Sequence, residues 1–324
     1  MPRTFSTRLA LVTALVSFGI PTPSRADYPD KPVRLIAPFP PGGGVDSVAR
    51  VIANALSERL GRQFIVDTHG GASGRIGTEL AAKATPDGYT LLLGSVGPNA
   101  IVPAAYRNLP YDAVNSFAPI SLVGTSAYAL VVPTAVAAKT VDELIALAKA
   151  QPGKLNFAST GNLGGPHLAG ELFKDLAKIK AEHIAYKGGG PIIAALLGNE
   201  VSFAFVSLPT VAPHMKAGTL RVLAVTGSER ATTMRNVPTM AESLPGYQVL
   251  QWYGVLAPAN TPVEIVGRLH DEIVKAVNDP KIKARLASID TEAYTNTPEA
   301  FQAQIKADIA KYRKLIEQAG VQVE

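Results

Sequence analysis

The 324-residue chain contains no cysteine. This absence excludes a disulfide framework, a lipid anchor attached to a cysteine and a thiol nucleophile, so the protein must fold on its hydrophobic core alone. Beyond residue 26 the sequence has no unbroken run of about 18 apolar residues, the length of a membrane-spanning helix. We therefore expect the mature chain to be soluble.

The common catalytic motifs are absent as well. Gly94-Ser95-Val96-Gly97 lacks the first glycine of GxSxG, and HExxH does not occur. The histidines are scattered through the chain without the spacing of metal ligands. The sequence therefore predicts no catalytic residues, no metal site and no cofactor. The histidines are His69, His167, His183, His214 and His270.

The chain has no basic run with interleaved aromatic residues, so we do not expect a nucleic acid as a partner. It contains 31 Lys and Arg against 26 Asp and Glu, and three of the arginines precede residue 27. Without those three, the net charge is only about +2. The basic balance is therefore partly a property of the first residues.

Residues 1–26 have the pattern of a secretory signal peptide. Two arginines come before or at the start of an apolar run over residues 9–20, and Ser24-Arg25-Ala26 fits a small-x-small cleavage site. The run is too short to span a bilayer comfortably. We therefore expect export to the periplasm and a mature chain that begins near Asp27.

Strand and helix patterns alternate along most of the remaining chain, which indicates an α/β fold with mainly parallel sheets. Its length is sufficient for two domains. Residues 120–124 and 128–132 are predicted to form two strands. Two helices are predicted to close the chain. The first would begin at a capping box, Thr261 to Glu264, with Pro262 at its first position, and the second would pack the apolar face of residues 301–319 on the first domain.

The stretch from Leu35 to Leu56 holds an apolar strand, a turn with three consecutive glycines and a helix pattern. Such a turn suits an anion, because the first N–H groups of a helix lack partners, the helix dipole is positive there and glycines allow close approach. Residues 42–47, GGGVDS, fit neither GxGxxG nor the P-loop pattern, which favours a carboxylate over a phosphate. The structural alternative is an ordinary strand-to-helix turn.

The same plan occurs twice more. Leu155 to Leu176 has a short strand, a turn rich in Ser, Thr, Asn and Gly, and a helix. His183 to Pro191 again has a strand, glycines and a helix start, with Pro191 suited to the first helical turn. Two anion-ready turns far apart in the sequence would suit one ligand held at both ends.

Several polar residues near these turns allow two interpretations each. Ser95 and Asn99 follow a predicted strand at residues 89–93, and they either point into a cleft or cap the next helix. His167, in the first turn of the second Gly-rich helix, is either a ligand donor or a residue hydrogen-bonded to its own loop. Lys187 is a solvated charge or, given its glycine neighbours, a ligand contact.

Six segments, in their order and spacing, resemble the extracytoplasmic solute receptors of the tripartite tricarboxylate transporter family, often called Bug receptors. The resemblance covers essentially the whole mature chain. The segments are PFPPGGGVDSVAR, ATPDGYTLLLGS, ASTGNLGGPHLAGELF, AYKGGGP, PHMKAGTLRVLAV and QWYGVLAPANTP.

This resemblance implies a type II periplasmic binding protein fold, with two α/β domains and a ligand cleft between them. Domain one would comprise residues 27–126 and 250–324, including the C-terminal helices, and domain two residues 127–249. Family members mostly bind small carboxylates. A small carboxylate and the membrane permease subunits of the transporter are therefore the implied partners of a receptor that works as a monomer.

The resemblance also implies the residues of the binding site. One carboxylate would be held by the PFPPGGG turn and another by the STGNLGG turn, mainly through backbone N–H and hydroxyl donors. The first half-site would contain Phe39, Pro41, Gly42, Gly43 and Gly44 with Ser95 beside them, the second Ser159, Thr160, Gly161, Asn162 and His167, and Gly188 and Ser207 would close the cleft.

The chain departs from the family pattern in two places. Residues 68–75, THGGASGR, stand where NRPGAGGN is common, and Phe205-Val206-Ser207 stands where Phe-Asp-Asn is common. Both departures concern the middle and the far end of the implied ligand.

Three functional classes follow from these patterns. The first is a transport receptor that hands a carboxylate to a permease, and the second is a periplasmic sensor that signals through a membrane kinase. The third is an enzyme that acts on a carboxylate, suggested by Ser159, His167 and Asp46 near the implied cleft. No nucleophile, base and orienting group occur at a recognised spacing, which favours the receptor classes.

Replacement of Gly43 by a bulky residue is expected to abolish ligand binding and leave the fold intact, because the side chain would occupy the place of the carboxylate. Calorimetric titration of the folded variant is the test. Normal affinity would count heavily against a carboxylate site at this turn.

Overall fold

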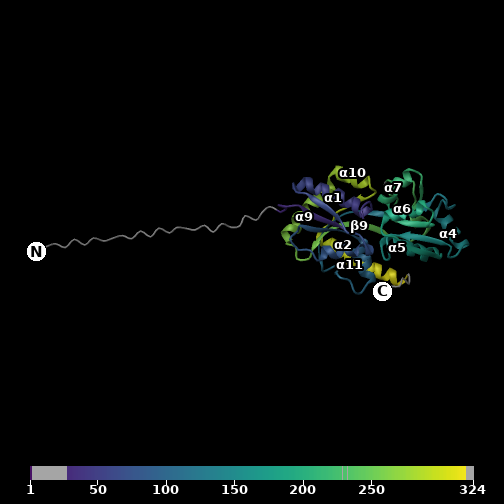
Figure 1. Cartoon of the computed structure of the whole chain (residues 1–324), viewed down its shortest axis with the longest axis horizontal. Coiled ribbons are helices and arrows are strands. Elements are labelled where there is room, and N and C mark those ends of the chain that lie inside the picture. Colours follow the sequence, from purple (N-terminus) through teal and green to yellow (C-terminus); the bar gives the residue numbers. More distant parts are fainter. Residues whose placement is uncertain (2–27, 228, 232, 319–324) are drawn as a thin grey trace.

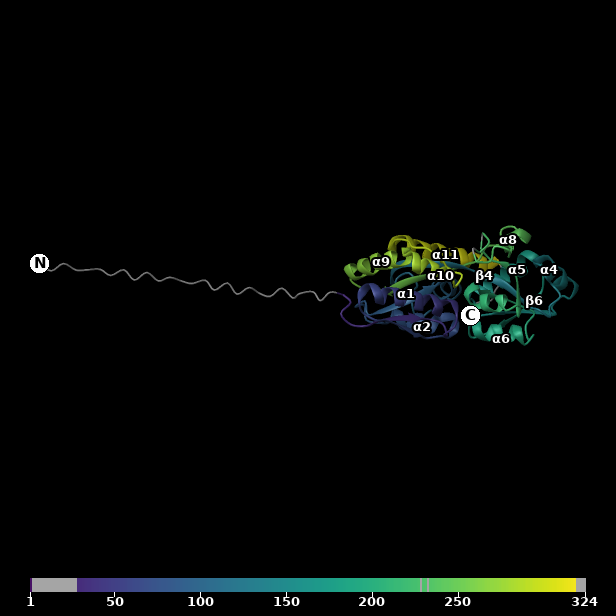
Figure 2. The ribbon, with the colours of Figure 1, turned by 90° about the horizontal axis from the view of Figure 1, so that it is seen from above.

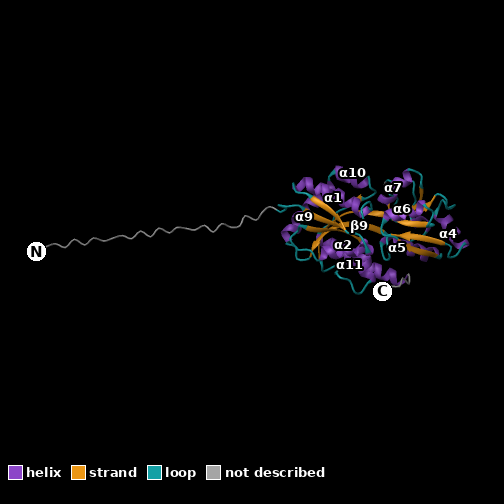
Figure 3. Ribbon diagram, viewed as in Figure 1, coloured by secondary structure: helices purple, strands orange, loops and turns teal. Residues whose placement is uncertain are grey.

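The computed structural model describes residues 28–227, 229–231 and 233–318, besides Met1 (Figure 1). The predicted signal peptide, residues 1–26, lies outside these ranges. Strands run through the middle of two lobes, and helices cover their outer faces (Figure 3). Within the described ranges, no helix combines the length and the apolar character that crossing a membrane requires.

The first lobe is built on a mixed sheet. Its strands run in the order β2 (Phe64–Thr68), β1 (Val33–Ala37), β3 (Thr90–Ser95), β9 (Leu250–Pro258), β4 (Phe117–Pro133) and β10 (Glu292–Ala293). β1 pairs parallel with β2 and with β3. β9 pairs antiparallel with β3 and β4, and β10 pairs antiparallel with β4. The α-helices are α1 (Gly44–Leu60), α2 (Arg75–Ala82), α3 (Val102–Ala105), α9 (Val263–Asn278), α10 (Pro280–Ala287) and α11 (Pro298–Gln318). A short 3-10 helix, η1 (Ala72–Gly74), and a short π-helix, η2 (Gly97–Ile101), accompany them.

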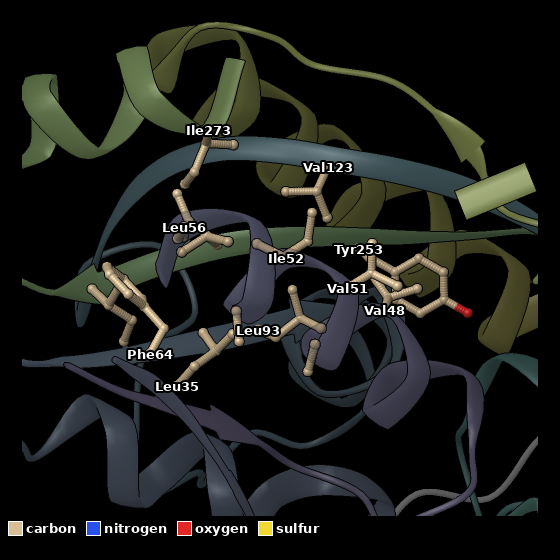
Figure 4. Close-up of a cluster of buried hydrophobic side chains, with 14 of the residues drawn as sticks. Leu35, Val48, Val51, Ile52, Leu56, Phe64, Leu93, Val123, Tyr253 and Ile273 are labelled. Carbon is tan, nitrogen blue, oxygen red and sulfur yellow. The ribbon is translucent and has the colours of Figure 1, made fainter. Parts of the chain in front are cut away.

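Both faces of this sheet are covered by helices. Successive strand residues point to opposite sides, and here both sets of side chains are apolar and need a covering layer. Leu35 packs with the apolar stripe of α1, in which Ile52 and Leu56 recur at helical spacing (Figure 4). Its neighbour Ile36 belongs to the cluster that contains Phe301 of α11. The expected packing of the last helix on the first lobe is therefore confirmed from Phe301 to Ile316, whereas residue 319 lies outside the described ranges.

The second lobe repeats the α/β plan. Its strands run in the order β6 (Ala181–Ala185), β5 (Leu155–Ser159), β7 (Phe203–Ser207), β4 and β8 (Leu220–Val225). Figures 1 and 2 place α4 to α7 around this half of the molecule and α1, α2 and α9 to α11 around the other half. The helices are α4 (Val141–Ala150), α5 (Gly165–Ala177), α6 (Gly189–Leu197), α7 (Leu208–Lys216) and α8 (Met240–Ser243).

The two strands predicted at residues 120–124 and 128–132 are in fact one. β4 pairs with β9 over its first part and with β7 and β8 over its last part, so it belongs to both lobes. Gly124 does not end the strand: it allows β10 to approach, since a Cβ there would lie 2.8 Å from the carbonyl oxygen of Glu292. The link between the lobes is therefore a continuous strand.

The end of the chain also differs from the prediction. Three helices close it, because Pro280 ends α9 by holding Asp279 extended, and the Asp279 carboxylate then accepts from the N–H of Lys281 and caps α10. Pro262 is the N-cap of α9 and not its first helical residue. In the described structure the N-cap of α9 carries no side-chain capping bond, and the Thr261 hydroxyl donates to the carbonyl of Pro258 at 2.8 Å, so the predicted capping box is wrong.

Asp290 is expected to make stability depend on pH. It lies between α10 and β10 with φ +53°, and its Oδ1 is buried without a partner among the described residues. Burial raises the pKa of this carboxyl to about 6. The folded state disfavours the charged form, so the penalty is absent below the unfolded pKa and grows as the pH rises through about 4 to 6.

We therefore expect Asp290→Asn to raise the free energy of unfolding at about pH 8 by on the order of 1 kcal/mol, because asparagine has no charge to desolvate. At about pH 3.5 the variant and the wild type should be equally stable. Asparagine tolerates the left-handed backbone, so the substitution adds no strain. Urea unfolding at both pH values is the measurement, and an equal gain at both would contradict the assignment.

Candidate functional site

Four helices begin at one cavity between the lobes. This inner cavity, of about 110 Å³, is lined by the N-cap residues Gly43 of α1, Gly164 of α5, Gly188 of α6 and Ser207 of α7. None of these N-caps carries a side-chain capping bond in the described structure. The helix starts therefore offer unpaired backbone N–H groups and positive dipole ends to whatever occupies the cavity.

The volume suits a small ligand. One water-sized group needs roughly 10–15 Å³ of cavity volume, so the inner cavity has room for on the order of ten such groups. The predicted residues that line it are Phe39, Pro41, Gly43, Gly44, Ser95, Thr160, Gly188 and Ser207.

Two glycines of these helix starts are required by tyrosines from β4, which both lobes share, and from its neighbour β9. A Cβ on Gly44 would lie 2.6 Å from the Tyr253 hydroxyl and 3.0 Å from the Ser207 Oγ. A Cβ on Gly165 would lie 2.0 Å from the Tyr128 hydroxyl. β4 and β9 therefore bring phenol groups directly against the first turns of α1 and α5.

Two hydroxyl groups on the cavity lack partners. The Ser95 Oγ and the Tyr253 hydroxyl are buried and make no hydrogen bond to any described residue. Burial raises the pKa of Tyr253, so the phenol keeps its proton and can donate. The sequence predicts Ser95 and Asn99 either to point into a cleft or to cap the next helix. Ser95 lines the cavity. The Asn99 Oδ1 instead accepts from the N–H of Ser95 at 3.1 Å and holds the end of β3.

The cavity is almost free of charged side chains. Lys187 is the one charged residue among the described lining residues, and its side chain is exposed. The remaining polar groups are neutral: the Tyr128 hydroxyl donates to the Gln251 Oε1 at 2.5 Å, and the hydroxyls of Ser207 and Thr210 bond at 2.8 Å. An anion here would be held by neutral donors, as the sequence of the turns predicts.

A second, larger cavity of about 390 Å³ continues from the inner one, and we call it the outer groove. It shares Phe39, Pro40, Thr160, Lys187 and Gly188 with the inner cavity. The predicted residues Gly161 and Asn162 line this groove and not the inner cavity. The remaining residues that define it are Gly71 to Arg75, Val102, Tyr106, Ala185 and Tyr186.

The other predicted residues, Gly42, Ser159 and His167, are not among the described lining residues of either cavity. The N–H of Gly42 donates to the Asp46 carboxylate at 3.0 Å. The Ser159 Oγ lies 2.6 Å from the His183 Nε2. These hydrogen bonds stabilise the Gly-rich turns without contributing residues to the lining of either cavity.

His167 likewise holds its own loop. Its Nδ1 accepts from the buried N–H of Leu163 at 3.0 Å, and its ring stacks on His183 at a centroid distance of 4.0 Å. Burial, followed by the nearby His167, lowers the pKa of His183 to about 3, so the His183 ring is neutral and can pair with Ser159. Of the two interpretations, the structural one describes His167.

Sequence reasoning missed the site residues that come from β4 and β9. Tyr128, Gln251 and Tyr253 line the inner cavity and are buried within apolar segments. The available signal was a polar or phenolic side chain in a strand otherwise made of apolar residues, since such groups need partners when buried.

The lobes touch beside the outer groove. The Ser73 hydroxyl of the first lobe donates to the carbonyl of Asn162 of the second at 2.6 Å. Leu163 and Leu168 pack in a cluster formed mainly by first-lobe residues. Both lobes therefore enclose the inner cavity in this structure.

We expect His167→Ala to lower the free energy of unfolding by about 2 kcal/mol, because the buried N–H of Leu163 loses its acceptor. His214→Ala is the matched control, since the His214 ring makes no hydrogen bond to the described residues. Denaturant unfolding of both variants is the measurement. Equal stability of the two would show that the ring does not support the loop.

Comparison with known proteins places the chain in a family. The model of the tripartite tricarboxylate transporter family receptor matches residues 48–321. The protein BugT of Bordetella pertussis is 35% identical over 323 residues, which cover 98% of this chain and 99% of BugT.

Solved structures agree with this match. The structure of R. palustris Rpa4515 with adipate has a TM-score of 0.88 and 33% identity, covering 91% of this chain and 99% of that one. MatC from Rhodopseudomonas palustris with bound malate has a TM-score of 0.84 and 26% identity, covering 89% and 100%. The chain therefore belongs to the receptor family of the tripartite tricarboxylate transporters, the Bug receptors, and has the two-lobed α/β fold of a periplasmic binding protein.

Proposed function

We propose that this protein is a periplasmic receptor that captures a small carboxylate in the inner cavity and delivers it, as a monomer, to a membrane permease of the tripartite type. The observation that carries the proposal is the set of four uncapped helix starts around a cavity that also holds two unpartnered hydroxyls. The structural relatives named with adipate and with malate hold carboxylic acids.

The strength of such a site is adequate for capture. Each hydrogen bond to a charged group contributes about 1.5 to 3 kcal/mol and each helix end up to about 1 kcal/mol. Three or four such bonds, less the costs of ordering, correspond to micromolar binding, about 8 kcal/mol.

The proposed domains are residues 27–126 with 250–324, and residues 127–249. Two core clusters of the second lobe draw on residues between Ala127 and Val249, which supports these limits. The first boundary falls within β4, so opening would bend a continuous strand. A ligand that contacts both lobes would favour the closed form, because its contacts are complete only there.

A periplasmic sensor that feeds a two-component system is the alternative. It would use the same cavity and a different docking partner, and the identity of the neighbouring genes, permease or sensor kinase, distinguishes the two roles. An enzyme is disfavoured, because the relatives are solute-binding proteins and because Ser159, His167 and Asp46 are not among the described lining residues of either cavity.

A thermal-shift panel of mono-, di- and tricarboxylates, aromatic acids and acidic amino acids, with phosphates and sugars as controls, tests the ligand class. A ligand that binds only the folded state must raise the midpoint of unfolding. We expect a rise with one class of carboxylate. Mass spectrometry of the denatured protein identifies any ligand carried through purification, and a response to phosphates alone would contradict the proposal.

The unpartnered hydroxyls provide a sharper test. We expect Ser95→Ala and Tyr253→Phe each to weaken carboxylate binding about tenfold and to leave the unfolding midpoint unchanged or higher, because neither hydroxyl has a protein partner to lose. Ser121→Ala is the matched control: its Oγ donates to the carbonyls of Leu122 and Asn296, so this variant should lose stability and keep its affinity. Full affinity in both cavity variants would contradict the site.

A further inference from the structure

The outer groove differs in charge from the inner cavity. Its described lining residues include two cations and no carboxylate: Lys187, which also lines the inner cavity, and Arg75, which does not. Arg75 belongs to the first lobe and Lys187 to the second. A ligand group placed between them would therefore contact both halves of the protein, next to the point where Ser73 bonds Asn162.

The guanidinium of Arg75 is held in place. Its Nε donates to the carbonyl of Ala72 at 3.3 Å, and its Cζ lies 4.7 Å from the centre of the Tyr106 ring. Within the described structure these contacts use Nε and one face of the group, which leaves both terminal nitrogens for a ligand. Glu79, one turn further along α2, pairs with Lys83 at 2.6 Å.

The loop that precedes Arg75 has an unusual backbone. Ala72, Ser73 and Gly74 have φ of +48°, +56° and +89°, in the left-handed region. This turn places Arg75 at the first position of α2, half-buried at the groove. Its position coincides with one of the two departures from the family pattern, where asparagine is common.

The two cavities adjoin, because they share lining residues. They meet at Pro40 and Gly188, where a Cβ on Gly188 would lie 3.4 Å from the Pro40 ring. The inner cavity offers neutral donors for one carboxylate, Lys187 lies where the two cavities adjoin, and a ligand chain that extends from the inner cavity into the outer groove reaches Arg75. The neutral donors of the inner cavity, the held guanidinium of Arg75 in the outer groove and the exposed ammonium of Lys187 where the two cavities adjoin suit an elongated acid with two anionic ends.

We propose that the outer groove binds the second carboxylate of an elongated dicarboxylate, with Arg75 as the main contact and Lys187 as a weaker one from the opposite lobe. This assignment rests on the proposed function, because it assumes that the first carboxylate lies in the inner cavity. A planar guanidinium can bind a carboxylate through two parallel hydrogen bonds, whereas the exposed ammonium acts as a solvated point charge.

The test compares acids of equal chain length with one or two carboxylates, from succinate and butyrate to suberate and octanoate, by calorimetric titration. We expect the wild type to prefer the dicarboxylate of at least one longer pair. Arg75→Met should reduce that preference about tenfold or more and leave the affinity for the monocarboxylate unchanged. Arg75→Lys should retain part of the preference, and Lys187→Met should lower it less.

Arg107→Met is the matched control, because it removes the same charge from an exposed neighbour of Tyr106 that does not line the groove. It should leave the preference unchanged.

An equal loss for both acids in Arg75→Met, an equal effect of Arg107→Met, or a wild type that gains nothing from the second carboxylate would each overturn the inference. The last outcome, with monocarboxylates still bound, leaves the proposed function standing, whereas no response to any acid in the thermal-shift panel counts against the proposed function itself.

Discussion

The unpaired N–H groups at the starts of α1, α5, α6 and α7 are the constraint on which the cleft depends. Such groups are costly when buried without an acceptor. The chain does not cap them with its own side chains, and the described lining of the inner cavity holds no carboxylate. The N–H groups therefore need a hydrogen-bond acceptor that does not belong to the protein. An anion is a better acceptor than a neutral solute, because the helix starts are positive.

The strands that join the lobes also build the site. β4 runs through both sheets, and together with β9 it places Tyr128 and Tyr253 against the first turns of α5 and α1. The glycines at those turns are needed because a Cβ would collide with a phenol oxygen. The link between the lobes and the chemistry of the cavity therefore depend on the same residues, so a change in the strand would affect both.

Local patterns predicted much of this arrangement. The Gly-rich strand-to-helix turns were recognisable because the loss of hydrogen-bond partners at a helix start is a property of a few consecutive residues, and Gly43, Gly44 and Gly188 all line the inner cavity. The prediction was weaker where the direction of a side chain matters. His167 occupies the expected helical turn, but its ring bonds Leu163 and stacks on His183, a residue of a neighbouring strand.

By itself, the sequence determined the alternation of strands and helices, the three anion-ready turns and the family, because each depends on short-range patterns or on the order of motifs along the chain. Tertiary structure alone decided that residues 120–132 are part of one strand, that Ser95 and Tyr253 share a cavity, and that Arg75 and Lys187 line one groove from opposite lobes. The reason is physical: a burial pattern shows that a side chain lies inside, whereas its neighbours there come from strands and helices far along the chain, whose positions are set by packing.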